Sequence, residues 1–300
     1  TLIDTADAYS RDEAEFGHNE ELVANALRSY GRTDVLVATK GGHTRRGSDW
    51  ELDGSPAYLR RACEASLRRL HVDAIGLYQF HRPDPATPWE ESMGALRALF
   101  DDGLVRMVGI SNADIDQIDA ARAICGDALV SVQNQFSPGW RSSADELAHC
   151  ASHGLAWLPW SPFGGVSAAG SLDAEAPAFS EVAAELGVSV YQVTLAWHLA
   201  QADVVLPIPG ASRPESIVDS AAAGFSPDFG GTGVSAPLNR AFHANRRTAN
   251  ASDAATRKPR RGMTREYANQ NSKRSPRMRS ARLLCTGNEP RRDSIWYVAT

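Results

Sequence analysis

The chain has 300 residues, of which 43% are hydrophobic and 22% charged, and this composition is that of an ordinary globular protein with a sizeable core. No run approaches the roughly 18 consecutive apolar residues that a membrane-spanning helix needs, so we expect no membrane partner. The cysteines include no C-x-x-C pair and are Cys63, Cys125, Cys150 and Cys285. We therefore expect reduced thiols and a cytoplasmic protein rather than a disulfide framework.

The formal charge of −5 is unevenly distributed along the chain. From Gly230 onward, 15 basic residues stand against four acidic ones, for about +11, whereas the part before Gly230 carries about −16. After Phe225 the chain also loses its hydrophobic periodicity and becomes rich in Arg, Asn, Ser and Pro, a composition typical of disorder. We expect an organised domain over residues 1–225 and a basic, disordered tail over residues 226–300. The tail has no interleaved aromatic residues and no recognisable module, so a nucleic-acid partner is the weaker alternative.

Up to Phe225, short apolar runs alternate with segments of helical period. The runs are apolar on both faces, which is typical of parallel strands covered by helices. Seven strands are predicted in this way: 2–4, 35–39, 74–78, 105–110, 129–132, 155–159 and 204–208.

Helices are predicted between and after these strands, at 19–30, 56–70, 89–100, 114–124, 143–152, 178–186, 190–200 and 214–223. Ser55 precedes Pro56 and is the expected N-cap of the second helix. The apolar stripe predicted for the first helix consists of Leu22, Val23, Ala26 and Leu27. The stripe predicted for the second consists of Leu59, Cys63, Ser66, Leu67 and Leu70.

The repeated alternation of strand and helix predicts a parallel α/β sheet. An open, doubly wound sheet concentrates its functional groups at one switch point, whereas a (β/α)8 barrel spreads them over the carboxyl ends of many strands. In this sequence, candidate functional side chains follow several different strands, which favours the barrel. With seven strands and no leader before Thr1, we expect a (β/α)8 TIM barrel that lacks its first β/α unit.

Side chains with catalytic chemistry follow several predicted strands. Asp4 and Tyr9 follow the first, Lys40 the second and His81 the third. Reduction of a carbonyl group needs a proton donor at the oxygen, and a tyrosine hydroxyl is a poor acid unless a nearby cation stabilises its phenolate. Lys40 is the candidate cation, Asp4 the group that holds it charged, and His81 a donor that orients the substrate oxygen.

Each of these four residues also has a purely structural interpretation. Asp4 can cap the next segment, Tyr9 can pack in a loop, Lys40 can be solvated at the rim and His81 can be a satisfied structural histidine. The occurrence of all four in this order favours the catalytic interpretation. His149 and His153 have the i, i+4 spacing of zinc ligands, but no third ligand is evident, so we expect no metal.

Several segments together resemble the aldo/keto reductase family. LIDTADAYS is similar to the segment that carries the family's catalytic Asp and Tyr, VLVATKGG to its lysine strand and LYQFHRPDP to its histidine strand. GLVRMVGISN, VSVQNQFS, WLPWSPFGG and VLPIPGASRPESI resemble its cofactor-binding segments. The resemblance implies that catalysis depends on Asp4, Tyr9, Lys40 and His81. It implies cofactor contacts from Ser111, Asn112, Gln133, Trp160, Ser161, Phe163, Gly164, Gly210, Ser212 and Arg213.

The family binds its dinucleotide without a Gly-rich turn, and G-x-G-x-x-G does not occur in this sequence. Arg213 offers a cation for an adenosine 2′-phosphate, so the resemblance implies that NADPH is preferred to NADH. The expected cofactor is therefore NADP(H), and no metal is expected. As an alternative, Arg213 simply flanks Pro214 at the start of a helix. Ser10 stands where the family usually has Gly, and Trp160 replaces a more usual Tyr while keeping a stacking face.

These observations predict NADPH-dependent reduction of an aldehyde or ketone, with a small carbonyl compound as partner. One alternative is a non-catalytic NADPH-binding regulatory subunit, which would bind the cofactor without turnover. Another is an inactive truncated or frameshifted fragment, because loss of one strand would leave two edges of the barrel unpaired. The particular substrate and the oligomeric state do not follow from the sequence.

Overall fold

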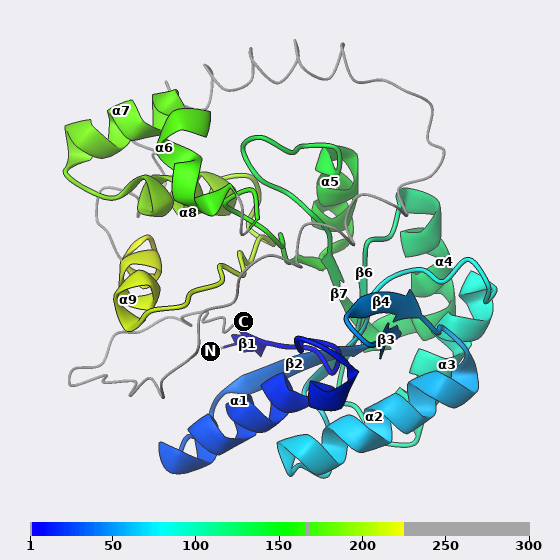
Figure 1. Ribbon diagram of the computed structural model, residues 1–300. Helices are drawn as coiled ribbons and strands as arrows, with labels where there is room; N and C mark the ends of the chain where they lie inside the picture. Colours follow the sequence, from blue (N-terminus) through cyan, green and yellow to red (C-terminus); the bar gives the residue numbers. More distant parts are fainter. Residues whose placement is uncertain (1, 166–167, 225–300) are drawn as a thin grey trace.

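The computed structural model describes residues 2–165 and 168–224 and contains a curled sheet of six parallel strands (Figure 1). The strands run in the order β1-β2-β5-β6-β7-β8, so neighbours in the chain are neighbours in the sheet. Their bounds are β1 Leu2–Asp4, β2 Leu36–Gly41, β5 Leu77–Phe80, β6 Val108–Ser111, β7 Leu129–Gln133 and β8 Ala156–Trp157. The register places Lys40 opposite Gln79 and Ser111 opposite Gln133, so polar residues gather at the carboxyl ends of the strands.

The helices follow the strands as the alternation predicts. Their bounds are α1 His18–Ser29, α2 Pro56–Leu70, α3 Trp89–Asp101, α4 Ile115–Cys125, α5 Ala144–His153, α6 Leu172–Glu175, α7 Pro177–Leu186, α8 Val190–Leu199 and α9 Pro214–Ala222. Consecutive helices from α1 to α4 pack against one another along the outer face of the sheet. Short 3₁₀ turns lie at η1 Glu13–Glu15, η2 Gly126–Ala128 and η3 Ala169–Ser171.

Local sequence explains where these helices begin and end. Ser55 caps α2 by accepting from the Tyr58 amide, as predicted. Asp114 and Gln117 form a capping box at the start of α4. Gly154 and Gly187 end α5 and α7 in the left-handed conformation, which glycine adopts without a steric penalty.

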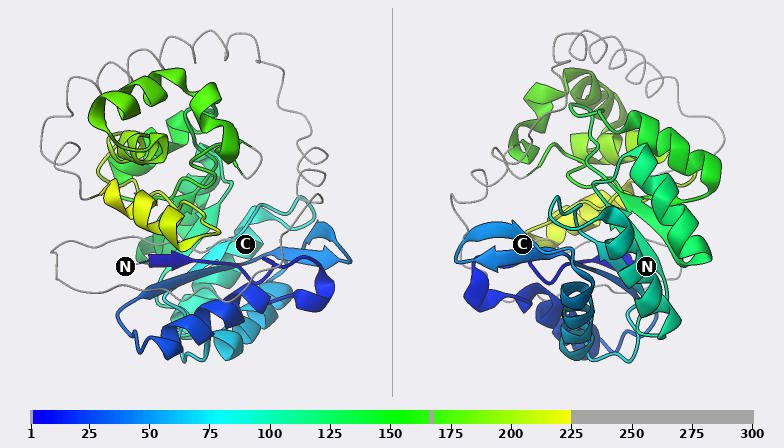
Figure 2. Two further views of the ribbon diagram at one scale, coloured as in Figure 1. Left: turned by 60° about the vertical axis from the view of Figure 1, so that its left-hand side comes forward. Right: turned by 90° about the vertical axis from the view of Figure 1, so that its right-hand side faces the viewer.

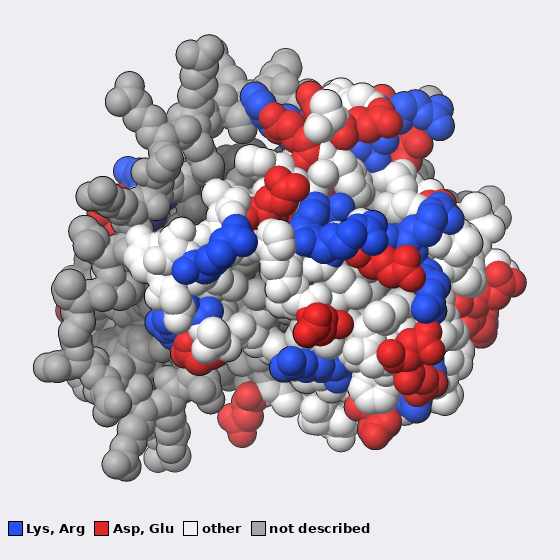
Figure 3. Space-filling model, turned by 90° about the horizontal axis from the view of Figure 1, so that it is seen from below, with Lys and Arg blue, Asp and Glu red and all other residues white. Residues whose placement is uncertain are grey.

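The outer core lies between the sheet and its helices. On α2 the predicted stripe is confirmed, because Leu59 and Cys63 are fully buried and Leu70 nearly so. On α1 the predicted stripe is wrong in part, because Leu22 is 36% exposed while the polar Asn19 and Glu20 are buried. The solvent side of these helices carries interspersed acidic and basic side chains (Figure 3).

A smaller apolar cluster lines the inside of the curl. It joins the two ends of the sheet and consists of Leu2, Ala38, Leu77, Leu158 and Ile208. The seventh predicted strand, 204–208, is present only as a single parallel bridge between Trp157 and Val205. Pro207 has no N–H to donate to a ladder, which explains why pairing stops there. Within the described residues, the structure is therefore a parallel α/β half-barrel rather than a closed barrel.

A two-stranded antiparallel hairpin was not predicted. It consists of β3 (His43–Arg46) and β4 (Asp49–Leu52), joined by Gly47 and Ser48. Gly47 has a φ of 58°, and glycine in the first position is what a tight two-residue hairpin turn requires. The hairpin leaves the sheet directly after β2 and lies beside the loop that follows β1 (Figure 2).

The structure has three cysteines within its described residues, all free and buried: Cys63, Cys125 and Cys150. Burial raises the pKa of the Cys63 and Cys150 thiols to about 12 and that of the Cys125 thiol to about 11.

None of the helices in the described ranges combines the length and the apolar character that crossing a bilayer requires. The predicted tail, 226–300, and Cys285 within it lie outside the described residues.

Candidate active site

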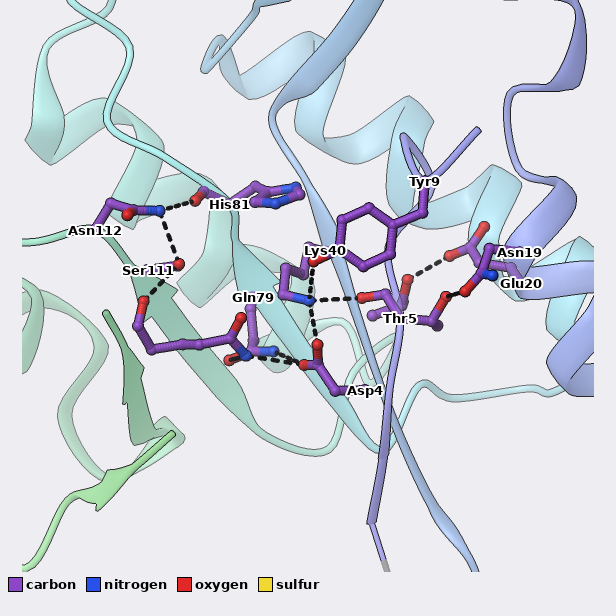
Figure 4. Close-up of polar contacts among 12 residues, drawn as sticks. Asp4, Thr5, Tyr9, Asn19, Glu20, Lys40, Gln79, His81, Ser111 and Asn112 are labelled. Atoms are coloured by element: carbon purple, nitrogen blue, oxygen red, sulfur yellow. Dashed lines mark hydrogen bonds and ion pairs between the residues drawn. The ribbon is translucent and has the colours of Figure 1, made fainter. Parts of the chain in front are cut away.

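Asp4 and Lys40 form a fully buried ion pair at the carboxyl ends of β1 and β2 (Figure 4). Lys40 Nζ donates to Asp4 Oδ2 and also to the Thr5 carbonyl oxygen at 2.9 Å. Burial alone would lower the pKa of Lys40, but the Asp4 carboxylate and the Tyr9 hydroxyl outweigh burial and raise it. The lysine is therefore a cation at neutral pH, held in place by its counter-ion.

Tyr9 lies in the loop after β1 and reaches back over the same lysine. Lys40 Nζ donates to the Tyr9 hydroxyl oxygen at 3.2 Å and lies 4.8 Å from the centre of the tyrosine ring. Tyr9 is partly exposed, whereas Lys40 and Asp4 are completely buried. The three groups form a chain of contacts from a buried carboxylate, through a buried cation, to the hydroxyl group of a partly exposed tyrosine.

His81 follows β5 and packs against the Tyr9 ring. The two rings meet edge to face with centres 5.6 Å apart. Burial, the neighbouring His43 and the Lys40 charge lower the pKa of His81 well below its ordinary value. Its imidazole is therefore neutral at neutral pH, and Nδ1 has no hydrogen-bond partner among the described residues.

Two glutamine amides hold the second oxygen of Asp4. Gln79 Nε2 and Gln133 Nε2 each donate to Asp4 Oδ1 at 2.9 Å. The sequence predicted a site role for Gln133 but not for Gln79. One signal in the sequence could have indicated Gln79: it is a polar residue inside the otherwise apolar strand LYQF. A polar side chain in a fully buried strand needs a hydrogen-bond partner, so its presence there suggests a specific contact.

Ser111 and Asn112 extend this network from the end of β6. Ser111 Oγ donates to the Gln133 carbonyl oxygen at 2.6 Å, and Asn112 Nδ2 donates to Ser111 Oγ and to the His81 carbonyl oxygen, both at 3.0 Å. Asn112 has a φ of 60°, the left-handed region that non-glycine residues seldom occupy. Hydrogen bonds therefore link these two residues to the group formed by Asp4, Lys40, Tyr9 and His81.

The predicted residues after β8 lie in one continuous turn. Trp160 is half-buried at the inner apolar cluster, and Ser161 has a φ of 52°. Phe163 is 8% exposed and meets the Tyr191 ring of α8 edge to face at 5.1 Å. Gly164 closes the turn by donating its amide to the Ser161 carbonyl oxygen at 2.9 Å.

Gly210, Ser212 and Arg213 lie on the surface just before α9. All three are exposed. Arg213 occupies the N-cap position of α9 without a side-chain cap hydrogen bond, and Pro214 follows it in the first turn. The helix predicted over 214–223 is confirmed as α9, and Arg213 flanks Pro214 at its start.

The β3–β4 hairpin adds residues that the sequence did not predict. The His43 ring lies 4.4 Å from the His81 ring, and the Trp50 ring lies 5.0 Å from that of His43. Burial, helped by the Arg82 charge, lowers the pKa of His43 to about 4. The rings of Tyr9, His81, His43 and Trp50 thus pack in succession, each edge to face with the next, beside the candidate site.

A second buried polar network lies behind the sheet, on the helix side. Thr5 Oγ1 donates to Asn19 Oδ1 at 2.6 Å, and Thr39 Oγ1 donates to Glu20 Oε1 at 2.5 Å. Thr5 follows Asp4 and Thr39 precedes Lys40, and successive side chains of an extended segment point to opposite faces. Figure 4 shows the Thr5 side chain directed toward Asn19. Arg69 Nε forms an ion pair with Glu20 Oε2 at 2.6 Å.

In the described part of the chain, no group of three or more His, Cys, Asp or Glu side chains is arranged to hold a metal ion. His149 Nε2 lies 2.8 Å from an Asp119 oxygen, and His153 Nδ1 lies 2.9 Å from the His149 carbonyl oxygen. The two histidines thus have partners within the protein.

A parallel half-barrel with polar side chains gathered at the carboxyl ends of its strands has the architecture of a barrel enzyme. Residues 1–228 match the model of the aldo/keto reductase family, and the chain belongs to this family of oxidoreductases. It is 35% identical over 223 residues to an uncharacterized oxidoreductase of Schizosaccharomyces pombe, a match that covers 74% of this chain and 69% of that protein. It is 34% identical over 245 residues to a probable aldo-keto reductase of Glycine max, covering 72% and 68% respectively.

Solved structures of aldo/keto reductases have the same fold. One from Klebsiella pneumoniae, in complex with NADP and acetate, superposes with a TM-score of 0.64 at 27% identity, over 82% of this chain and 80% of that one. An aldo-keto reductase structure from Klebsiella pneumoniae with NADPH gives a TM-score of 0.60 at 29% identity, over 74% of each chain. The similarity confirms the resemblance that the sequence motifs indicated.

Proposed function

We propose that the protein reduces an aldehyde or ketone to the alcohol with NADPH, and that Tyr9 donates the proton. The observation that carries this proposal is the chain of contacts from Asp4 through Lys40 to the Tyr9 hydroxyl. NADPH held at this site would supply the hydride for the carbonyl carbon. Tyr9 transfers its hydroxyl proton to the carbonyl oxygen, which completes the alcohol, and the phenolate then takes a proton from solvent.

Lys40 makes the proton transfer feasible. A phenolate that forms 3.2 Å from a buried ammonium group is stabilised by a charge that water does not screen. The Asp4 carboxylate keeps that ammonium group charged and directs it, while Gln79 and Gln133 hold the carboxylate. None of these groups has to move as charge develops on Tyr9.

His81 orients the substrate in this proposal. Because its imidazole is neutral, it donates a hydrogen bond to the carbonyl oxygen without competing with Tyr9 as an acid. Its position edge-on to the Tyr9 ring puts both donors on the same side of the site. The substrate oxygen would therefore lie between the two.

The cofactor contacts are proposed on the residues whose chemistry fits a dinucleotide. Ser111, Asn112 and Gln133 offer amide and hydroxyl groups to the nicotinamide carboxamide, and Trp160 offers a stacking face. Ser161, Phe163 and Gly164 are proposed for the pyrophosphate, with the Ser161 hydroxyl group and the amides of Ser161 and Phe163 as donors, since the Gly164 amide is already bonded to the Ser161 carbonyl oxygen. Gly210, Ser212 and Arg213 suit the adenosine phosphate, since Arg213 is an exposed cation at a helix start.

The experiment measures NADPH binding by fluorescence and carbonyl-dependent NADPH oxidation with a panel of aliphatic and aromatic aldehydes and ketones. We expect binding and turnover in the wild type, and tighter binding of NADPH than of NADH. NADPH binding without turnover would indicate the regulatory subunit instead. Absence of both, in a protein that melts cooperatively, would contradict the proposed function.

A further inference from the structure

The side chain of Arg45 ties the β3–β4 hairpin to the Tyr9 loop. Its guanidinium donates through Nε to the Ala8 carbonyl oxygen at 3.3 Å and through Nη2 to the Ser10 carbonyl oxygen. These two carbonyl groups flank Tyr9 in the chain. Nη1 donates to the Ser48 carbonyl oxygen at 2.8 Å, which fixes the same guanidinium to its own hairpin turn.

Trp50 holds the guanidinium flat. The Arg45 Cζ atom lies 3.6 Å from the centre of the indole ring, the short distance of a stacked guanidinium. Trp50 is in turn packed edge-on against His43, whose backbone carbonyl accepts from the Tyr58 hydroxyl at 3.0 Å. The hairpin is thus anchored to α2 on one side and presents Arg45 to the Tyr9 loop on the other.

A second contact supports the same docking. The Glu13 amide donates to the Gly47 carbonyl oxygen at 2.9 Å, and the Gly47 amide donates to Glu13 Oε2 at 3.3 Å. Within the loop, the Tyr9 amide donates to the Ala6 carbonyl oxygen at 3.3 Å. Ser10 Oγ lies 2.8 Å from the Asp12 carbonyl oxygen and 3.5 Å from that of Ala8. The hairpin therefore adds bonds from outside the loop to the carbonyl groups on both sides of Tyr9.

We infer that Arg45 is a positioning residue for the proton donor, acting through the Ala8 and Ser10 carbonyl groups to hold the Tyr9 hydroxyl against Lys40. The inference rests on the proposed function, because it assigns Arg45 a part in proton donation by Tyr9. Only Arg offers five N–H donors on three coplanar nitrogen atoms, in a group that also stacks on an indole ring. Lysine can reach one carbonyl group but cannot bracket the tyrosine.

The test compares Arg45→Gln and Arg45→Lys with Arg46→Gln as the matched control. Arg46 is the next residue of β3, with a side chain 80% exposed and an ion pair to Glu51 at 3.0 Å. Displacement of a reacting group by about 1 Å can cost on the order of 100-fold. We therefore expect kcat to fall about 10- to 100-fold in Arg45→Gln and less in Arg45→Lys, with NADPH affinity unchanged. Arg46→Gln should retain wild-type kcat.

Two further measurements separate positioning from a general structural role. In a Tyr9→Phe background, Arg45→Gln should cause no additional loss of kcat, since the residue through which it acts is gone. Hydrogen exchange of the backbone amides around Tyr9 should be faster in Arg45→Gln than in Arg46→Gln, while the cores of α2 and α3 keep their protection. This second readout does not depend on activity.

Wild-type kcat in Arg45→Gln, or a loss that adds fully to that of Tyr9→Phe, would overturn the inference. Unchanged exchange around Tyr9 would also overturn it, even if Arg45→Gln were less active. If the wild type showed no carbonyl reduction, the proposed function would fail, and the exchange comparison would still decide whether Arg45 holds the loop.

Discussion

Asp4 and Lys40 form an ion pair that is fully shielded from solvent. The two side chains differ in the hydrogen bonds that each would keep if the other were lost. Asp4 also accepts from the amide groups of Gln79 and Gln133. Among the described residues, the other acceptors of Lys40 are neutral oxygens, those of Thr5 and Tyr9. Loss of one partner of a buried pair leaves a charge without its counter-ion, so the two possible losses should differ in their effect.

Asp4→Asn should lower the free energy of unfolding by about 3–5 kcal/mol, because it leaves a buried ammonium group with neutral acceptors only. Lys40→Met should lower it less, since the remaining carboxylate keeps two amide donors. Urea unfolding curves of both variants and of the double variant give these values. If the double variant were destabilised by the sum of the two single losses, the proposed coupling of the pair would be wrong.

Tyr9→Phe removes the hydroxyl group that contacts Lys40 and leaves the ring against His81. We expect kcat for carbonyl reduction to fall by roughly 10²- to 10⁴-fold, the usual contribution of a positioned acid, while NADPH still binds. Steady-state kinetics and fluorescence titration measure the two effects. Tyr30→Phe is the matched control, since Tyr30 is 48% exposed at the end of α1. Equal kcat in both variants would exclude Tyr9 as the proton donor.

Gly41, directly after Lys40, leaves room for a buried tyrosine. A Cβ atom at this position would lie 2.1 Å from the Tyr78 hydroxyl oxygen and 3.0 Å from Cζ. Gly41→Ala should therefore lower the free energy of unfolding by about 1–3 kcal/mol. Tyr78→Phe should recover part of this loss, because it removes the nearest atom, a hydroxyl group with no hydrogen-bond partner among the described residues.

The control for this prediction is Gly94→Ala in α3. A Cβ atom there meets nothing within 4 Å, so alanine should stabilise the helix by about 0.5–1 kcal/mol. Thermal and denaturant unfolding compare the variants. Gly41→Ala with wild-type stability would mean that Tyr78 moves aside freely.

His198 of α8 should make stability depend on pH. Nε2 donates to the Pro162 carbonyl oxygen at 3.1 Å, whereas buried Nδ1 has no partner within the described part of the chain. Burial, opposed by the bond to Pro162 and aided by the Arg141 charge, lowers the pKa to about 4. The unfolded state therefore takes up the proton first, so this contribution is complete above pH ~6.5 and declines as the pH falls toward 4.

The shift corresponds to about 3 kcal/mol between neutral pH and a pH well below 4. His198→Gln should flatten this part of the dependence of unfolding free energy on pH, measured in urea between pH 4 and 7. Some slope should remain, because His43 and His81 also have lowered pKa values. His18→Gln, an exposed substitution at the start of α1, should keep the full slope. A slope unchanged in His198→Gln would contradict the assignment.

Regular periodicity made much of the fold predictable. Continuous apolar runs predicted the six paired strands, and capping residues such as Ser55 and Asp114 lie where the helices begin. The prediction was wrong where a tertiary contact outweighed local pattern. On α1, Asn19 and Glu20 face the core, where Asn19 accepts from Thr5 and Glu20 accepts from Thr39. This orientation of the helix leaves Leu22 partly exposed. The 204–208 segment failed as a strand because Pro207 cannot extend the ladder.

The sequence by itself determined the family, and it singled out Asp4, Tyr9, Lys40 and His81 as a set, because strand ends in a parallel sheet meet at one edge. Only the tertiary structure decided how these side chains contact one another. Lys40 donates to Asp4 Oδ2, and Gln79 donates to Asp4 Oδ1. The tertiary structure also brought Arg45 and Trp50 to the Tyr9 loop. That docking joins residues about 40 positions apart through side-chain geometry, and no periodicity along the chain encodes such a contact.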